Sequence, residues 1–172
     1  MIFAVSSGGT DLGISPPFAF CSFMYKVINY LTLGIAYEEH DKIIADTGGL
    51  PGIKNDRLDS VLYHMQNDDY YPFFEDKLTH LVHSVAENHS FQDGNKRSSI
   101  VLGSLFLKIN YFPDDVISDF IQKMEALVLM LVEKEICKDD LNGYLFFIIN
   151  EEEMPEEMLI PLEDRIREER NC

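Results

Sequence analysis

The feature that most constrains this fold is a helical stretch whose residues are apolar on nearly every side. Between Ser99 and Tyr111 the apolar residues are Ile100, Val101, Leu102, Leu105, Phe106, Leu107 and Ile109. A helix that is apolar all round is usually buried among other elements. The sequence therefore predicts a central helix over residues 98–110, enclosed by the rest of the chain.

Helical spacing of apolar residues predicts further helices on both sides of this stretch. They are expected over residues 37–45, 56–65, 75–88, 113–131 and 139–149. Acidic residues near the start of several of these stretches suit a helix N-terminus. We therefore expect an all-α fold of about seven helices bundled around the buried central helix, with or without a small β-hairpin flap.

The length of 172 residues and the 46% hydrophobic content predict one domain with a sizeable core. We assign that domain to residues 24–150. Residues 1–23 are either an upstream extension, with Met24 as the native start, or an ordered N-terminal arm. Residues 151–172 form a distinct acidic tail.

The tail carries nine acidic residues against three arginines, a net charge of −6. Its apolar residues predict a short amphipathic helix that is broken at Pro161. A solvated, partly mobile tail is the simpler interpretation. The alternative is that the tail contacts a partner or covers the functional site.

Charge and cysteine content restrict the classes of partner. The chain has 14 basic and 30 acidic residues, for a formal charge of −16, which repels nucleic acid and anionic membranes. Three unpatterned cysteines, Cys21, Cys137 and Cys172, indicate free thiols and a reducing, cytoplasmic setting. The sequence shows neither an apolar run long enough to span a membrane nor a clear signal peptide.

A polar decapeptide lies between the helix predicted over 75–88 and the central helix. Its sequence, from residue 89 to residue 98, is HSFQDGNKRS. The backbone N–H groups at a helix N-terminus are unpaired and carry partial positive charge. Gly94 permits close approach of a ligand, and Asn95, Lys96 and Arg97 add donors. Together these features predict a site for a polyphosphate anion.

Two further residues of the decapeptide give this site a chemistry. Asp93 is a hard oxygen ligand suited to Mg²⁺, which binds through one or two carboxylates and substrate phosphates. A histidine side chain can act as a proton acceptor near neutral pH, so His89 could take a proton from an attacking hydroxyl. The pattern therefore indicates transfer of a phosphate-containing group to a hydroxyl. Each part also has a structural alternative: a core histidine, an Asp-Gly-Asn turn and a solvated Lys-Arg pair.

Two other possible sites have simpler explanations. A transition-metal site that includes His83 is rejected, because His83 and His89 are six residues apart and lie on different sides of a helix. His40 lies on the apolar face of the helix predicted over 37–45, and we interpret it as structural. Phe91 is interpreted as an apolar anchor for the loop.

The decapeptide resembles the signature loop of the Fic/Doc family, H-x-F-x-[DE]-[GA]-N-[GK]-R. Fic enzymes that transfer AMP typically have a second glycine where this chain has Lys96, and another arginine where it has Ile100. Both differences match the Doc (death-on-curing) toxin branch. Weaker matches are His40-Asp41, Gly48 to Gly52 followed by Arg57-Leu58, and Tyr71-Pro72, so that the resemblance covers roughly residues 37–112.

This resemblance implies a Fic/Doc-like helical fold and a Doc-like toxin of a toxin–antitoxin system. Such a toxin moves the γ-phosphate of a nucleoside triphosphate such as ATP, with Mg²⁺, onto a Ser or Thr hydroxyl of a protein of the translation elongation factor class. His89 would be the general base and Asp93 the Mg²⁺ ligand. Gly94 and Asn95 would cradle the phosphates, and Lys96 and Arg97 would neutralise their charge.

Two alternatives stay open beside the kinase. One is protein adenylylation in the usual Fic manner. The other is an inactive Fic fold kept as a binding or regulatory module. The chain lacks the Ser/Thr-x-x-x-Glu-Gly/Asn motif that inhibits some Fic-like proteins. The resemblance therefore implies a separate antitoxin.

The aromatic segment over residues 66–74 also has two interpretations. Its side chains Tyr70, Tyr71, Phe73 and Phe74 are expected to be ordinary core anchors. In the resembling family, however, the segment between the corresponding helices forms a flap that holds the target peptide. On that view residues 50–74 would contain the substrate-binding edge.

Overall fold

The computed structural model describes residues 27–171, and in this range it has seven α-helices and no β-strand. The predicted extension over residues 1–23 lies outside the described range. The helices are α1 (Leu33–Thr47), α2 (Arg57–His64), α3 (Phe74–Glu87), α4 (Asn95–Ile109), α5 (Asp114–Val132), α6 (Lys138–Asn150) and α7 (Glu156–Asn171). The predicted all-α fold is confirmed.

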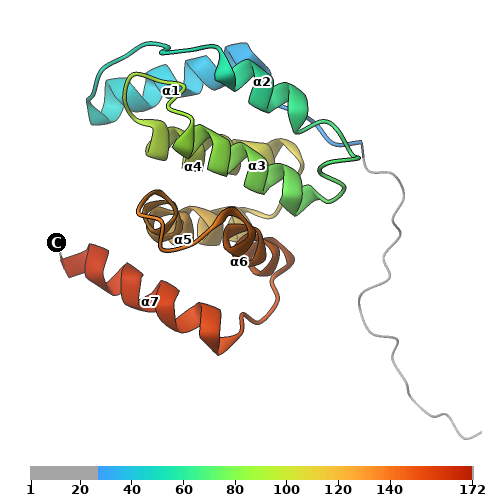
Figure 1. The fold of residues 1–172 in the computed structure, drawn as a ribbon, viewed down its shortest axis with the longest axis vertical. Helices are drawn as coiled ribbons and strands as arrows, with labels where there is room; N and C mark the ends of the chain where they lie inside the picture. The colour runs from blue at the N-terminus through green and yellow to red at the C-terminus, as the bar shows by residue number, and fades with distance from the viewer. Residues whose placement is uncertain (1–26, 172) are drawn as a thin grey trace, which may run out of the picture.

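The helices lie in successive layers (Figure 1). α1 and α2 form one layer, α3 and α4 the next, α5 and α6 the third, and α7 covers the far side of α5. Helix α4 contacts α1, α3 and α5, which makes it the central helix that the sequence predicts. Its buried residues are Ser98, Ser99, Leu102, Gly103, Phe106 and Leu107.

Helix α4 begins at Asn95, three residues before the predicted start at 98. Gly94 is its N-cap in the left-handed conformation, with φ 70°, and the Gly94 carbonyl accepts a hydrogen bond of 2.8 Å from the Ser98 N–H. The polar residues Asn95, Lys96 and Arg97 are thus the first turn of the helix. This places the basic residues directly at its positive end.

The predicted hairpin flap is not formed as strands. The connection between α1 and α2 makes a single antiparallel bridge, between Ile53 and Phe91. Two glycines and a proline lie within residues 49–52, and this composition disfavours a regular strand. The connection is therefore an irregular segment that is paired with the decapeptide at one point.

The aromatic segment before α3 is only partly a core element. Phe74 stacks on Phe106, with ring centroids 4.7 Å apart and an interplanar angle of 3°. Tyr70 is 73% exposed and Phe73 is 56% exposed, so the prediction that they anchor the core is wrong. Because α3 begins at Phe74, the residues before it follow the surface.

The predicted break at Pro161 does not occur, because α7 runs through it from Glu156 to Asn171. Leu162 is buried and Ile166 packs against the core. Arg165 pairs with Glu133 and Glu135, which follow α5, at 2.6 and 3.5 Å. These tertiary contacts offset the hydrogen bond that a proline removes inside a helix.

The structure bears on two predictions made from composition, those on free cysteines and on membrane-spanning segments. Cys137 is an exposed free thiol; Cys21 and Cys172 lie outside the described residues. Among the helices described, none combines the length and the apolar character that a membrane crossing needs.

Two helical glycines give a matched test of the packing around α4. A Cβ atom on Gly103 would lie 2.7 Å from Cζ of Phe120 and 3.0 Å from Cγ2 of Val82. A Cβ atom on Gly143 of α6 would meet only the flexible end of Met158, at 3.3 Å. Overpacking of a core typically costs about 1–3 kcal/mol. We expect Gly103→Ala to lower the free energy of unfolding by that amount in urea titrations.

Gly143→Ala is the control for helix propensity. Replacing a helical glycine by alanine is favourable by up to about 1 kcal/mol where space permits. We expect this variant to be as stable as the wild type or slightly more stable. Equal effects of the two substitutions would contradict the close packing of α3, α4 and α5.

His80 provides a test that depends on pH. Its Nδ1 lies 2.9 Å from the Tyr71 hydroxyl, and the two rings stack at 4.4 Å. Burial, together with the charge of Lys138, lowers the pKa of His80 from 6.5 to about 4. The unfolded chain therefore binds a proton at His80 at higher pH than the folded chain does.

A lowered histidine pKa stabilises the fold fully above pH 6.5, and this stabilisation is lost as the pH falls from 6.5 toward 4. We expect the His80 ring signals to titrate near pH 4 in NMR spectra. His80→Gln should remove part of the pH dependence of stability in this window. Titration near pH 6.5 would contradict the burial of this ring.

Candidate active site

Residues 89–94 of the decapeptide form a tight loop between the end of α3 and the start of α4. His89 and Gly94 have positive φ values, 49° and 70°, and they reverse the chain at the two ends of the loop. A Cβ atom on Gly94 would lie 2.9 Å from Cδ1 of Ile44, so a side chain there would displace Ile44 and would also be strained by the positive φ. Phe91 lies between them with its ring completely buried, in the anchoring role that the sequence predicts.

The side-chain amide of Asn95 holds this loop closed. Its Oδ1 accepts a hydrogen bond from the Phe91 N–H, and its Nδ2 donates one to the Phe91 carbonyl, both at 3.0 Å. This use of the amide differs from the predicted phosphate cradle. What Asn95 offers to a ligand is its backbone N–H at the start of α4.

The start of α4 provides several backbone donors that have no partner within the helix. The first hydrogen bond along the helix runs from Ser98 to Gly94, so the N–H groups of Asn95, Lys96 and Arg97 have no acceptor within the helix. The positive end of the helix dipole adds to their effect. Backbone donors and basic side chains thus coincide at one point.

All six predicted site residues line one pocket of about 510 Å³. Its lining consists of Ala86, His89, Gln92, Asp93, Gly94, Asn95, Lys96, Arg97 and Val132. Ala86 belongs to α3 and Val132 to α5, and they add an apolar wall that the decapeptide pattern does not reveal. The pocket is therefore open to a ligand with both a charged and an apolar part.

His89 lies at the edge of this pocket with its side chain exposed. Its backbone is fixed, because the His89 carbonyl accepts a hydrogen bond of 3.0 Å from Nδ2 of Asn55. Within residues 27–171 the imidazole makes no hydrogen bond. Its two nitrogens are thus available to a substrate.

Asp93 is held as a carboxylate. It accepts hydrogen bonds from the Gly94 N–H at 2.6 Å and the Leu50 N–H at 3.4 Å, and Arg97 lies 3.8 Å away. The Gly94 N–H, then the Leu50 N–H and the charge of Arg97 lower the pKa of Asp93 below its usual range. The group is ionised at neutral pH, as a metal ligand must be.

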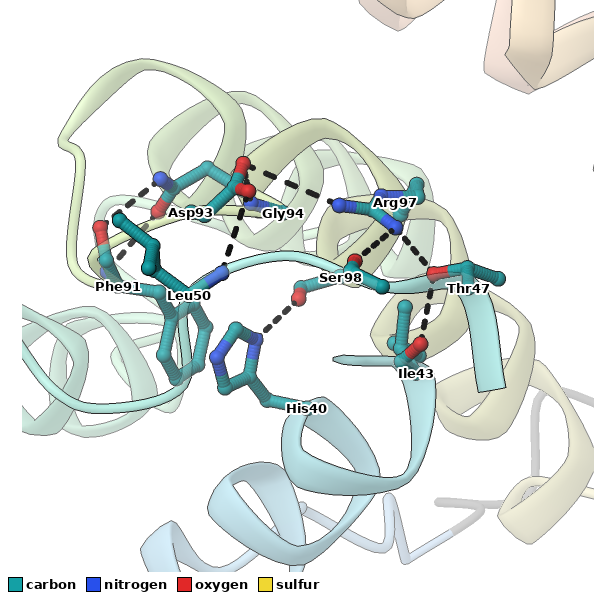
Figure 2. A network of polar contacts seen from close by, with 11 residues as sticks. His40, Ile43, Thr47, Leu50, Phe91, Asp93, Gly94, Arg97 and Ser98 are labelled. Atoms are coloured by element: carbon teal, nitrogen blue, oxygen red, sulfur yellow. Dashed lines mark hydrogen bonds and ion pairs between the residues drawn. The ribbon is translucent and has the colours of Figure 1, made fainter. Parts of the chain in front are cut away.

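Arg97 is held from the other side by the end of α1 (Figure 2). Its guanidinium donates to Oγ1 of Thr47 and to the Gly48 carbonyl, the latter at 3.0 Å. The side chain is therefore positioned before any ligand binds, between the Asp93 carboxylate and α1. A preset guanidinium loses less entropy when it contacts a phosphate.

The segment after α1 supports the decapeptide, although none of its residues lines the pocket. The Gly49 backbone passes so close to Asp93 that a Cβ atom there would lie 2.6 Å from Oδ2. Further on, the Gly52 carbonyl accepts from the Gln92 N–H at 3.0 Å, and the Ser90 carbonyl accepts from the Lys54 N–H at 2.8 Å. The two consecutive glycines were the available signal for this close approach.

The donor set fits Mg²⁺ rather than a transition metal. Among the described residues no group of three His, Cys, Asp or Glu side chains gathers as a metal cage. Mg²⁺ needs only one or two carboxylates when phosphates supply its other ligands. The ionised, half-exposed Asp93 beside the start of α4 meets that requirement.

Comparison with known proteins agrees with this geometry. No curated protein sequence matches the chain. A family model does match it, over a little under half of the chain and including α1 to most of α4. Residues 30–107, which contain the decapeptide and the segment after α1, are similar to the Fic/DOC family.

Proposed function

We propose that the protein transfers the γ-phosphate of a nucleoside triphosphate to a Ser or Thr hydroxyl of another protein. The observation that carries this proposal is the pocket at the start of α4. It brings together an unbonded histidine, an ionised carboxylate and a helix N-terminus with two basic side chains. The similarity of residues 30–107 to the Fic/DOC family supports it.

In this proposal His89 is the general base. Its ring lies at the pocket edge, where a hydroxyl can enter from solvent. One ring nitrogen takes the hydroxyl proton while the oxygen forms a bond to the γ-phosphorus. The bond between that phosphorus and the β–γ bridging oxygen breaks, and a nucleoside diphosphate leaves.

The other residues stabilise charge. Asp93 would hold Mg²⁺, which supplies charge neutralisation on the phosphate oxygens when it is bound. The N–H groups of Asn95, Lys96 and Arg97, with the two basic side chains, would receive the transferring phosphoryl group. Preorganised donors of this kind usually make the largest contribution to catalysis of phosphoryl transfer.

Lys96 and Ile100 favour phosphate transfer over AMP transfer. A glycine in place of Lys96 would leave room for the β- and γ-phosphates to pass the start of the helix. Lys96 would fill that room, and the nucleotide would bind in the reverse direction with its γ-phosphate toward His89. Ile100 stands where a second arginine would steady the usual orientation.

AMP transfer remains the second candidate, because the family match covers Fic and Doc proteins together. A catalytically inactive binding or regulatory module is a third. The formal charge of −16 is of the size that suits a basic partner. The label assay described below separates these three candidates.

The protein substrate would bind along the segment between α1 and α2. Leu50 is 68% exposed and Ile53 is 48% exposed, and Ile53 is bridged to Phe91 next to the pocket. A peptide extended along this segment would present a hydroxyl to His89. The resemblance to Doc further suggests a cytoplasmic toxin that acts on a translation elongation factor and is held inactive by a separate antitoxin.

A paired label assay tests the reaction. The protein is incubated with cell extract and Mg²⁺, once with α-³²P-ATP and once with γ-³²P-ATP. We expect label on protein from γ-³²P-ATP only, and none after Mg²⁺ is chelated. His89→Ala should lower the rate by about 10² to 10⁴, the usual contribution of a general base.

Lys108→Ala is the control variant, because it removes an exposed lysine at the opposite end of α4. It should label as the wild type does. Transfer of label from α-³²P-ATP would make the protein an AMP transferase. Absence of label with each of the four common nucleoside triphosphates would favour the binding module.

Lys96→Gly tests the explanation of nucleotide orientation. We expect the ratio of α-label to γ-label to rise in this variant, because the β- and γ-phosphates gain the space beside the helix. Lys108→Gly introduces the same helix-weakening residue at the other end of α4 and should leave the ratio unchanged. An unchanged ratio in Lys96→Gly would show that Lys96 does not decide the orientation.

A further inference from the structure

We propose that His40 on α1 is a positioning residue that holds the decapeptide loop in its active geometry. It lies beside the loop, close to Phe91 and Ser98, and the residue is only 1% exposed (Figure 2). It does not line the pocket, so it acts through the residues it contacts. Its effect on catalysis rests on the proposed function, whereas its effect on the loop does not.

The first contact of His40 is with the anchor of the loop. The imidazole is stacked on the Phe91 ring, with centroids 3.7 Å apart and an interplanar angle of 7°. Phe91 is also the residue whose backbone N–H and carbonyl are both hydrogen-bonded to the Asn95 side-chain amide. A change at His40 therefore alters the side-chain support of the residue around which the loop closes.

The second contact is with the first turn of α4. Nδ1 of His40 lies 2.9 Å from Oγ of Ser98, which is fully buried. Ser98 N–H in turn donates to the Gly94 carbonyl, the bond that starts the helix. His40 thus contacts both halves of the motif, the loop anchor and the helix start, and keeps them in register with α1.

The third observation is the other ring nitrogen. Nε2 of His40 is buried and has no hydrogen-bond partner within residues 27–171. Burying an unpaired polar atom is unfavourable, so stability alone would favour an apolar ring here. A phenylalanine would keep the stacking on Phe91 and lose only the bond to Ser98, whereas an alanine would lose both.

The location of Gly94 explains why a shift would matter to the chemistry. Cε1 of His40 lies 3.6 Å from the position of a Cβ on Gly94, so the imidazole also touches the N-cap of α4. Asp93 precedes this glycine, and the N–H groups without a partner in the helix follow it. A displacement of about 1 Å in groups that position a substrate can cost about 10²-fold in rate.

The test compares His40→Ala with His40→Phe and Ser98→Ala. We expect kcat for γ-label transfer to fall about 10- to 100-fold in His40→Ala, with KM for the nucleotide within about threefold of the wild type. His40→Phe should recover most of kcat, and its remaining loss should equal that of Ser98→Ala. Rates are normalised to the folded fraction from thermal melts.

Leu145→Ala controls for a loss of stability in general, because Leu145 is fully buried on α6, far along the chain from the loop. Its normalised kcat should equal that of the wild type. An equal fall in kcat for His40→Ala and Leu145→Ala would overturn the proposal. So would a His40→Phe variant as impaired as His40→Ala.

Amide hydrogen exchange gives a measure that does not require activity. The Phe91 and Gln92 amides are bonded across the loop, to Oδ1 of Asn95 and to the Gly52 carbonyl. We expect them to exchange at least about tenfold faster in His40→Ala, with the amides of α5 and α6 unchanged. Unchanged exchange at Phe91 and Gln92 would overturn the positioning role, even if the wild type transfers no label and the proposed function fails.

Discussion

The site depends on the pair of hydrogen bonds between the Asn95 side-chain amide and the backbone of Phe91. The short connection from Asn88 to Gly94 must turn the chain from α3 into α4 while carrying a histidine, a carboxylate and a glycine in fixed positions. A polar loop of this kind has little apolar area of its own to hold it together. The two hydrogen bonds of the Asn95 amide hold the loop closed, and the buried Phe91 ring fixes the loop to the core. The left-handed Gly94 then begins α4, whose first three residues line the pocket.

The charged groups of the pocket are held by a part of the chain more than forty residues away. Thr47 and Gly48 hold Arg97, and the Leu50 N–H donates to Asp93. Arg97 and Asp93 therefore lie close together without fully neutralising each other, because backbone groups also hydrogen-bond to each of them. The Gly48 carbonyl accepts from Arg97, and backbone N–H groups donate to Asp93. This arrangement also creates a small basic site on a chain of formal charge −16. Such a surface opposes a free nucleotide and favours one whose charge is reduced by Mg²⁺.

Predictions from local pattern succeeded where burial and periodicity agree. The apolar stretch of α4 lies at the centre of the fold because it has no polar face that could be turned toward solvent. Predictions failed where tertiary contacts outweigh a local preference. Pro161 does not end α7, since Leu162, Ile166 and the ion pairs of Arg165 hold the helix against α5. Phe73 and Tyr70 are exposed despite their apolar rings, because the chain passes over the surface before α3 begins at Phe74.

By itself the sequence determined the all-α class, the central helix and the set of decapeptide residues that line the candidate pocket, because each depends on spacing within one short stretch. The tertiary structure decided how those residues are used. Asn95 clasps Phe91 rather than offering its amide to the pocket, and Arg97 is held by α1. His40, 49 residues before His89 in the chain, lies beside the loop against Phe91. Such contacts depend on how helices pack, and helix packing is set by the whole core rather than by any local pattern.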